Sequence, residues 1–202
     1  MPTTIVPNHH ADHPGFRGLP GLVAALSFTV GRGATARLAS ELTRVGPDDR
    51  VVNIGCGPGT AVREARRRGA AATGVDPASV MLRVGRLLSR RPGITWAVGS
   101  AEALPVPDGA ATVVWSLATV HHWRDVGEGL AEVHRVLEPG GRFLVTERRT
   151  RPGARGLASH GWTHDQAEAF ATACGTAGLV DVAVQTRRAG RTSILVVTAR
   201  RA

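Results

Sequence analysis

A glycine cluster followed at a distance by one acid is the pattern in this chain that most clearly predicts ligand binding. Gly55-Cys56-Gly57-Pro58-Gly59 comes directly after the apolar run 51–54. Glycines allow a sharp turn and let a ligand lie against bare backbone, and the start of a following helix offers N–H groups to a negative group. Asp76 comes about 20 positions later, where an acid can accept hydrogen bonds from ribose hydroxyls. Together they predict a site for a ribose-containing ligand, although Asp76-Pro77 can also be interpreted as a helix cap.

The spacing of the glycines separates two classes of ligand. Dinucleotide-binding loops favour Gly-x-Gly-x-x-Gly, whereas here Gly59 comes one position early and Thr60 stands where the third glycine is expected. The resulting Gly-x-Gly-x-Gly is the spacing of loops that bind S-adenosylmethionine (SAM). Because the chain contains 25 glycines, the loop alone is weak evidence, and its meaning depends on the elements around it.

Strands and helices are predicted to alternate around this loop, which indicates a doubly wound, Rossmann-like α/β fold with a mostly parallel sheet. Two final runs, 180–186 and 193–198, predict an antiparallel C-terminal hairpin that completes seven strands. Thr163 and Gln166 form a plausible capping box at the start of the last helix. The other predicted strands are 50–54, 72–76, 94–98, 110–116 and 142–146, and the predicted helices are 36–45, 60–68, 77–90, 126–137 and 163–175.

Length and composition fit one globular domain. The 202 residues suit one domain better than two, with 1–35 expected to form an N-terminal arm or lid and a helix, and 36–202 the globular domain. The net charge of +9 raises nucleic acid, an anionic membrane or an acidic substrate as a partner. All 25 basic residues are arginines, however, and they are scattered apart from the run 148–151. The charge therefore does not favour a nucleic-acid partner.

The cysteines, histidines and apolar runs predict no disulfide framework, no metal site and no membrane span. Cys56 and Cys174 are too few for a disulfide framework, so a cytoplasmic location is expected. The apolar stretch 19–30 is too short to cross a bilayer. The arm holds three neighbouring histidines, but no further ligands follow at the spacing of a metal site. These histidines are His9, His10 and His13.

Five segments resemble the ordered motifs of one family, the class I SAM-dependent methyltransferases. The chain is most similar to methyltransferase type 11, the small-molecule branch that includes the quinone-biosynthesis C-methyltransferases. The resemblance covers about residues 36–148, and the order of the motifs is more specific than any single motif. The segments are Val-Val-Asn-Ile-Gly-Cys-Gly-Pro-Gly at 51–59, 74–82, Gly-Ser-Ala-Glu-Ala-Leu-Pro at 99–105, Ala-Thr-Val-His-His-Trp at 118–123, and 132–141.

The resemblance implies SAM as cofactor and a small-molecule methyl acceptor. It places the methionine part of SAM on the glycine loop, the ribose on Asp76, the adenine beside 100–102, and the sulfonium near Leu117 and Ala118. The cofactor-binding residues that it implies are Asn53, Gly55, Cys56, Gly57, Gly59, Asp76, Pro77, Ser100, Ala101, Glu102, Leu117 and Ala118.

Two positions depart from the family pattern. Asn53 stands where the family usually has an acid that positions the ammonium group of the cofactor. Asn keeps a carbonyl acceptor but loses the charge, which weakens the hydrogen bond. Ser100 stands where the family usually has an Asp that accepts from the adenine amino group, and its reach is shorter. We therefore expect weaker SAM binding than is usual in the family.

Methyl transfer from a sulfonium mainly requires alignment of the acceptor with the methyl group, and a base only if the attacking atom carries a proton. His122 is the first candidate base and His121 the second, because they follow a strand whose end should face the cofactor. A structural role, in which these histidines form hydrogen bonds to a neighbouring loop, explains their presence equally well. The remaining candidate bases are Glu147, His160 and His164.

The acceptor pocket has fewer sequence signals. Trp123, Trp162 and Phe16 can form a flat apolar wall or can simply pack in the core. Cys56 is not expected to be a nucleophile, since no base stands beside it. The connection 149–163 is too short for the lid that many relatives insert there, so we expect the N-terminal arm to cover the pocket.

Three alternative functions remain open on the sequence. A SAM-binding protein without methyltransferase activity is favoured by Asn53, Ser100 and the short connection. A nucleic-acid methyltransferase is suggested only by the net charge, because the chain has no Asn-Pro-Pro-aromatic or Cys-centred motif for base methylation. An NAD-dependent enzyme is disfavoured by Thr60 and by the His-His segment.

Overall fold

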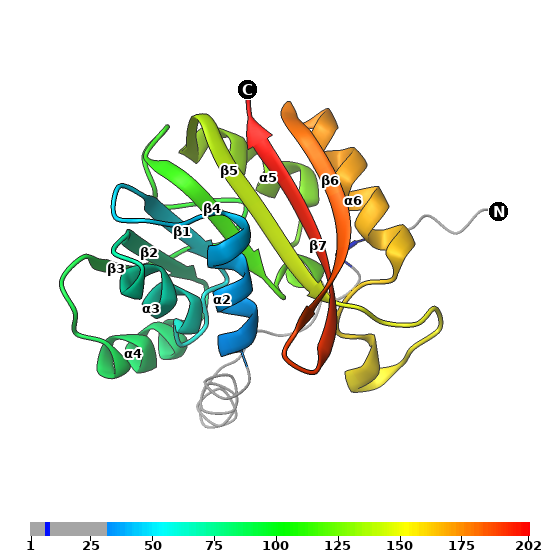
Figure 1. Ribbon diagram of the computed structural model, residues 1–202, viewed down its shortest axis with the longest axis horizontal. Helices are drawn as coiled ribbons and strands as arrows, with labels where there is room; N and C mark the ends of the chain where they lie inside the picture. Colours follow the sequence, from blue (N-terminus) through cyan, green and yellow to red (C-terminus); the bar gives the residue numbers. More distant parts are fainter. Residues whose placement is uncertain (1–6, 9–31) are drawn as a thin grey trace.

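The computed structural model describes residues 7–8 and 32–202, with the exception of the side chains of 157 and 158. These residues form one seven-stranded sheet of order β3-β2-β1-β4-β5-β7-β6 (Figure 1). Neighbouring strands from β3 to β5 are parallel, whereas β7 is antiparallel to both β5 and β6. The predicted fold class is confirmed. The strands are β1 (Arg50–Ile54), β2 (Ala71–Asp76), β3 (Ile94–Val98), β4 (Ala111–Leu117), β5 (Leu137–Arg148), β6 (Leu179–Ala189) and β7 (Thr192–Arg201).

Helices cover both faces of the sheet because the central strands are apolar on both sides (Figure 1). On β4, Val113 and Trp115 pack in the cluster that includes residues of α2, α3 and α4, while Val114 packs in the cluster beneath α5 and α6. The helices are α2 (Gly33–Leu42), α3 (Thr60–Arg67), α4 (Ser79–Leu88), α5 (Val126–Val136) and α6 (His164–Thr176), with the short 3-10 helices η1 (Val120–His122) and η2 (Gly156–Ser159).

The order of the strands fixes where a ligand can bind. From β1 the chain builds outward through β2 to β3, and it then returns to the other side of β1 with β4. This reversal makes the carboxyl ends of β1 and β4 the topological switch point, where open α/β sheets bind their ligands. The glycine loop follows β1, and η1 with its two histidines follows β4.

Two predicted boundaries were wrong. β5 begins at Leu137 rather than at 142, because Leu137 already pairs with Ala111. The register against β4 then shifts between Ala111 and Val113, around Gly140, which has φ of 76°. Helix α4 begins at Ser79, so Pro77 precedes the helix instead of lying in its first turn. The hairpin strands are also longer than predicted, because their outer ends carry polar residues that the apolar pattern does not include.

The capping box at the start of α6 is confirmed. The Thr163 hydroxyl accepts from the Gln166 backbone N–H at 3.3 Å, and the Gln166 side chain accepts from the Thr163 N–H at 2.9 Å. Most of the segment 1–35, which was expected to form an arm or lid and a helix, lies outside the described residues. None of the described helices is long and apolar enough to cross a membrane.

Candidate functional site

The glycine loop between β1 and α3 contains backbone conformations that only glycine adopts without strain. Gly57 and Gly59 have φ of 53° and 81°, in the left-handed region that other residues avoid. A Cβ on Gly59 would lie 2.1 Å from a ring carbon of Trp96, whereas a Cβ on Gly57 would meet nothing within 4 Å. The loop therefore packs tightly against β3 at Gly59 and leaves open space at Gly57, as ligand binding at the backbone requires.

Asp76 at the end of β2 holds the loop in place. Its Oδ2 accepts from the Gly57 N–H at 2.8 Å, and its Oδ1 accepts from the Ala78 N–H at 2.9 Å. Burial raises the pKa of this carboxyl above its usual value. Each carboxylate oxygen can accept a second hydrogen bond, so this arrangement is compatible with the ribose contact that the family resemblance implies. The hydrogen bond from the Ala78 N–H also agrees with the interpretation of Asp76 as a cap at the start of α4.

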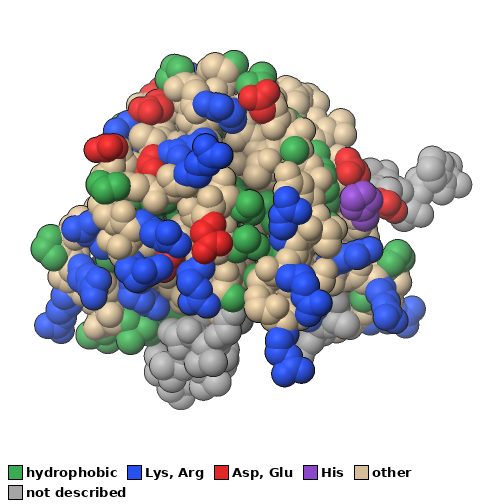
Figure 2. Space-filling model, in the orientation of Figure 1, with side chains coloured by type: hydrophobic (Ala, Val, Ile, Leu, Met, Phe, Trp, Pro, Cys, Tyr) green, Lys and Arg blue, Asp and Glu red, His purple; other side chains and the backbone are tan. Residues whose placement is uncertain are grey.

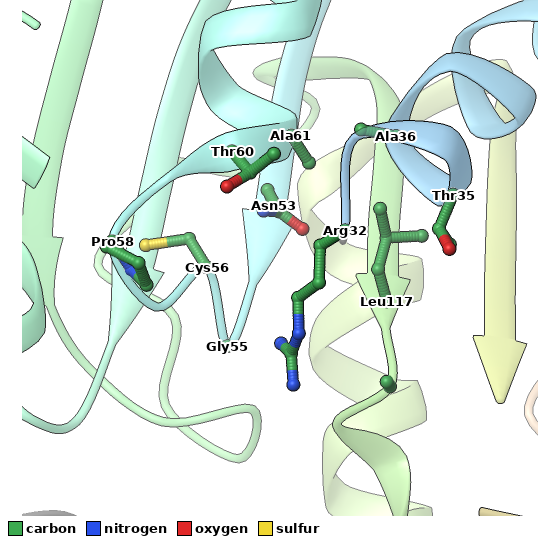
Figure 3. Close-up of a pocket in the computed structure, with 11 residues that line it drawn as sticks. Arg32, Thr35, Ala36, Asn53, Gly55, Cys56, Pro58, Thr60, Ala61 and Leu117 are labelled. Carbon is green, nitrogen blue, oxygen red and sulfur yellow. The ribbon is translucent and has the colours of Figure 1, made fainter. Parts of the chain in front are cut away.

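A hollow opens beside the loop at the switch point (Figure 3). The Asn53 side chain is buried there, and its Oδ1 has no hydrogen-bond partner among the described residues. An orphaned buried carbonyl oxygen is costly, and a donor such as an ammonium group would satisfy it. Of the residues predicted to bind cofactor, Asn53, Gly55, Cys56, Leu117 and Ala118 line the hollow.

Arg32 is a residue of the hollow that sequence reasoning missed. It precedes α2, and its side chain reaches in between the glycine loop and the end of β4 (Figure 3). Burial lowers the pKa of the guanidinium, while Glu147 and Asp76 raise it. Arginine stays charged in proteins and binds carboxylates through two parallel hydrogen bonds. No sequence signal separates Arg32 from the other arginines, and it falls in the segment expected to be an arm.

The remaining cofactor-binding candidates do not line the hollow. Glu102 accepts from the backbone N–H groups of Arg124 and Asp125 at 2.7 and 3.4 Å, so it ties its turn to the segment after η1. Ser100 forms a bridge to Ala103 within the same turn. These residues lie at the carboxyl side of β3, as the resemblance predicts for an adenine-binding turn. Outside the hollow's lining are Gly57, Gly59, Asp76, Pro77, Ser100, Ala101 and Glu102.

Cys56 and Ala118 have particular local features. Cys56 is buried, and its burial together with the nearby Asp76 charge raises the pKa of its thiol. A raised pKa opposes a nucleophilic role, in agreement with the expectation from the sequence. Ala118 has φ of 59°, and its N–H donates to the Thr146 carbonyl at 2.7 Å. A non-glycine residue in this region stores about 1–2 kcal/mol of strain, and such strain is typical of functional sites.

Beyond Ala118 the chain brings three of the candidate bases together. Ligand nitrogens of His121, His122 and His160 all lie within 4.8 Å of one another. His121 is buried, and its Nδ1 lies 2.9 Å from Oε2 of Glu147, whose side chain is fully buried on β5. The fifth candidate, His164, is exposed on α6 beside Glu168 and lies outside this histidine cluster.

The tryptophans are core residues rather than a pocket wall. Trp162 is fully buried and Trp123 is 4% exposed, and both rings pack against Phe170. Of the two interpretations that the sequence left open, core packing applies to these two tryptophans, and Phe16 lies outside the described residues. Residues 7 and 8 do contact this region: Trp162 Nε1 donates to the Pro7 carbonyl at 2.8 Å, and Asn8 Nδ2 donates to the Trp123 carbonyl at 3.0 Å.

Comparison with known proteins finds similarity to methyltransferases. Residues 52–145 match the family model described as methyltransferase domain. The chain is 32% identical over 112 residues to demethylmenaquinone methyltransferase from Tropheryma whipplei (strain Twist), covering 55% of this chain and 46% of that protein. It is 35% identical over 96 residues to malonyl-[acyl-carrier protein] O-methyltransferase from Pseudescherichia vulneris, covering 48% of this chain and 38% of that protein. The chain thus spans less than half the length of these relatives.

A solved structure shares the fold over most of the chain. An S-adenosylmethionine dependent methyltransferase from Mesorhizobium loti superposes with a TM-score of 0.69 at 22% identity, covering 86% of this chain and all of that one. The matched family model spans the glycine loop, Asp76 and the histidines after β4. Residues 52–145 thus match a methyltransferase domain, and the described residues share the fold of a solved SAM-dependent methyltransferase.

Proposed function

We propose that this protein transfers a methyl group from SAM to a small-molecule acceptor by in-line displacement. The observation that carries the proposal is the buried, unpartnered Asn53 Oδ1 in a hollow that also holds the Arg32 guanidinium. An oxygen acceptor and a cation beside a glycine loop fit the ammonium and carboxylate of a bound amino acid. When bound, SAM supplies an electrophilic methyl group on a sulfonium, with a neutral leaving group.

The residues of the hollow have separate roles in this proposal. Asn53 accepts from the ammonium group, and Arg32 binds the methionine carboxylate through its guanidinium. Asp76 accepts from the ribose hydroxyls while it holds Gly57 and Ala78 in place. The turn at 100–102 borders the adenine. Leu117 and Ala118 lie beside the sulfonium, so that the methyl group faces the segment that follows β4.

The acceptor is proposed to lie against the histidine cluster. In this proposal His121 and His122 lie on the acceptor side of the hollow, because η1, which holds both, begins two residues after Ala118. Glu147 fixes the orientation of His121 through Nδ1, whereas His122 is the more exposed of the two histidines. The relatives act on different acceptors, so no single compound is proposed here. The acceptor is proposed only as a small molecule. The cytoplasm is the proposed location, as two buried, unpaired cysteines fit a reducing compartment.

An assay with SAM labelled in its methyl group tests this proposal. We expect equimolar S-adenosylhomocysteine (SAH) and labelled product with at least one acceptor from a panel containing a demethylated naphthoquinol and a malonyl thioester. Failure of the protein to bind SAM at all would overturn the proposal.

A second candidate function is SAM binding without methyl transfer. It is favoured by the uncharged Asn53, which replaces an acid of the family pattern and leaves its oxygen buried without a partner among the described residues. Binding of SAM with no labelled product across the panel would support this function instead. A nucleic-acid substrate is not favoured, because the chain has no Asn-Pro-Pro-aromatic or Cys-centred motif for base methylation. Figure 2 shows arginines over much of the visible face, with the acids mainly in its upper half.

A further inference from the structure

The histidine cluster combines side chains from two separate segments of the chain. His121 and His122 belong to η1 after β4, and His160 comes from the connection after β5. Their ring centroids are 4.1, 5.6 and 5.7 Å apart, and a ligand nitrogen of each lies within 4.8 Å of the others. His121 is buried and the other two histidines are half-buried.

Glu147 gives the cluster a feature that simple packing does not require. Its carboxylate is completely buried and lies 2.9 Å from Nδ1 of His121. This contact fixes the ring and directs Nε2 away from the carboxylate. Metal-binding histidines typically donate their second ring nitrogen to a carboxylate, which orients the ring and raises the basicity of the ligating nitrogen.

We propose that His121, His122 and His160 bind one Zn²⁺ ion. Three imidazoles without a carboxylate ligand suit zinc or a similar transition metal rather than Mg²⁺ or Ca²⁺. Three histidines with a fourth position open are the arrangement of catalytic zinc sites, and among the described residues no further metal ligand joins these three. With Zn–N bonds of about 2.0–2.1 Å, tetrahedral geometry places the nitrogens roughly 3.3 Å apart. The nitrogens must therefore close by about 1.5 Å at most, which small side-chain rotations allow.

The open position would face the methyl acceptor. The cluster follows Ala118, which lines the cofactor hollow, so a group bound at the metal would lie on the acceptor side of the site. This step rests on the proposed function, and it indicates an acceptor with an oxygen that can bind a metal. In the metal-loaded protein His121 and His122 are ligands, and the Lewis acid replaces a protein base in activating that oxygen.

Titration of the full chain with Co²⁺, without cofactor or acceptor, tests metal binding independently of methyl transfer. We expect one Co²⁺ per chain with the intense visible absorption of four-coordinate cobalt, displaced by Zn²⁺. His122→Ala and His160→Ala should each abolish this signal while keeping the metal-free melting temperature within a few degrees. Glu147→Gln should weaken binding about 10–100-fold, as expected for loss of a carboxylate behind a histidine ligand.

Histidines elsewhere in the chain provide the controls. His134→Ala and His164→Ala, at histidines outside the cluster, should each keep the full signal. Equal binding by the wild type and a His122→Ala/His160→Ala double variant would overturn the proposal, as would the absence of binding in the wild type. None of these outcomes affects SAM binding, so the site and the proposed methyl transfer can fail separately.

Discussion

Asn53 and Arg32 decide, at the scale of single residues, how the hollow can hold an amino acid. Asn53 presents a buried oxygen without a partner among the described residues, and Arg32 contributes a cation that interacts with Glu147 and Asp76. The sequence singled out Asn53 as a residue of this site and missed Arg32. Asn53 stands inside a recognisable motif, whereas Arg32 reaches the site only because α2 packs against α3 and β4.

Replacing Arg32 tests its contact with the cofactor carboxylate. Arg32→Ala should weaken SAH binding about 10–100-fold, since a hydrogen bond to a charged group contributes about 1.5–3 kcal/mol. Arg37→Ala, on the exposed side of the same helix, is the matched control and should leave the Kd unchanged. Calorimetric titration measures both, and equal affinities for the two variants would contradict the assignment.

Restoring the family acid tests the role of Asn53. Asn53→Asp should tighten SAM binding several-fold, because a charge-assisted hydrogen bond to the ammonium is about twice as strong as a neutral one. The same change buries a carboxylate, so the melting temperature without SAM should fall. Thermal unfolding with and without SAM measures both effects. A variant that binds SAM more weakly than the wild type would show that the ammonium does not lie beside Asn53.

The loop after β1 and the cap of α6 are the elements whose local sequence fixes their geometry most directly. Both were predictable because a short motif carries the physical reason, glycine conformations in one case and reciprocal hydrogen bonds in the other. The ends of β5, β6 and β7 could not be predicted in this way. A strand extends as far as a neighbouring strand pairs with it, and the pattern of apolar residues gives no information about that pairing. The histidine cluster also depends on pairing, since β4 and β5 bring its members together.

Two alanine substitutions separate binding from packing in the glycine loop. Gly57→Ala adds a Cβ in open space at positive φ, so it should cost about 1–2 kcal/mol of stability and weaken SAM binding. Gly59→Ala adds the same strain and a clash with Trp96, so it should cost about 2–5 kcal/mol. Urea unfolding gives both values, and equal losses would mean that Trp96 can move aside.

The capping box gives a stability prediction for α6. Thr163→Ala removes the hydroxyl that accepts from Gln166, and should lower the free energy of unfolding by about 1 kcal/mol. Thr172→Ala, at an exposed position within the same helix, should have no destabilising effect because alanine has the higher helix propensity. Denaturant unfolding of the two variants checks this, and an equal loss in both would refute a specific capping role.

At the scale of the whole molecule, the order of strands joins the glycine loop and the histidine cluster at one end of the sheet. The alternation of strands and helices was enough to predict this fold, since parallel strands with buried faces admit few arrangements. The contact of residues 7 and 8 with the two buried tryptophans was beyond prediction, because 115 and 155 positions separate the partners in the chain.

The N-terminal arm provides a test at this scale. Removing residues 1–18 should reduce methyl transfer, because Pro7 and Asn8 contact the tryptophans that flank the histidine cluster. Asn8→Ala, which removes only the hydrogen bonds to Trp123 and Arg124, should produce a smaller loss. Unchanged turnover in the truncated protein would show that the arm does not cover the site.

Calorimetric titration of the wild-type chain with SAH tests the central claim most directly. We expect one SAH per chain with a Kd above about 1 µM, which corresponds to a binding free energy weaker than about −8.2 kcal/mol, because Asn53 and Ser100 replace the acids of the family. NAD should give no binding, since Gly59 and Thr60 do not fit the dinucleotide spacing. Absence of SAH binding, or binding of NAD in its place, would contradict the assignment of this hollow to SAM.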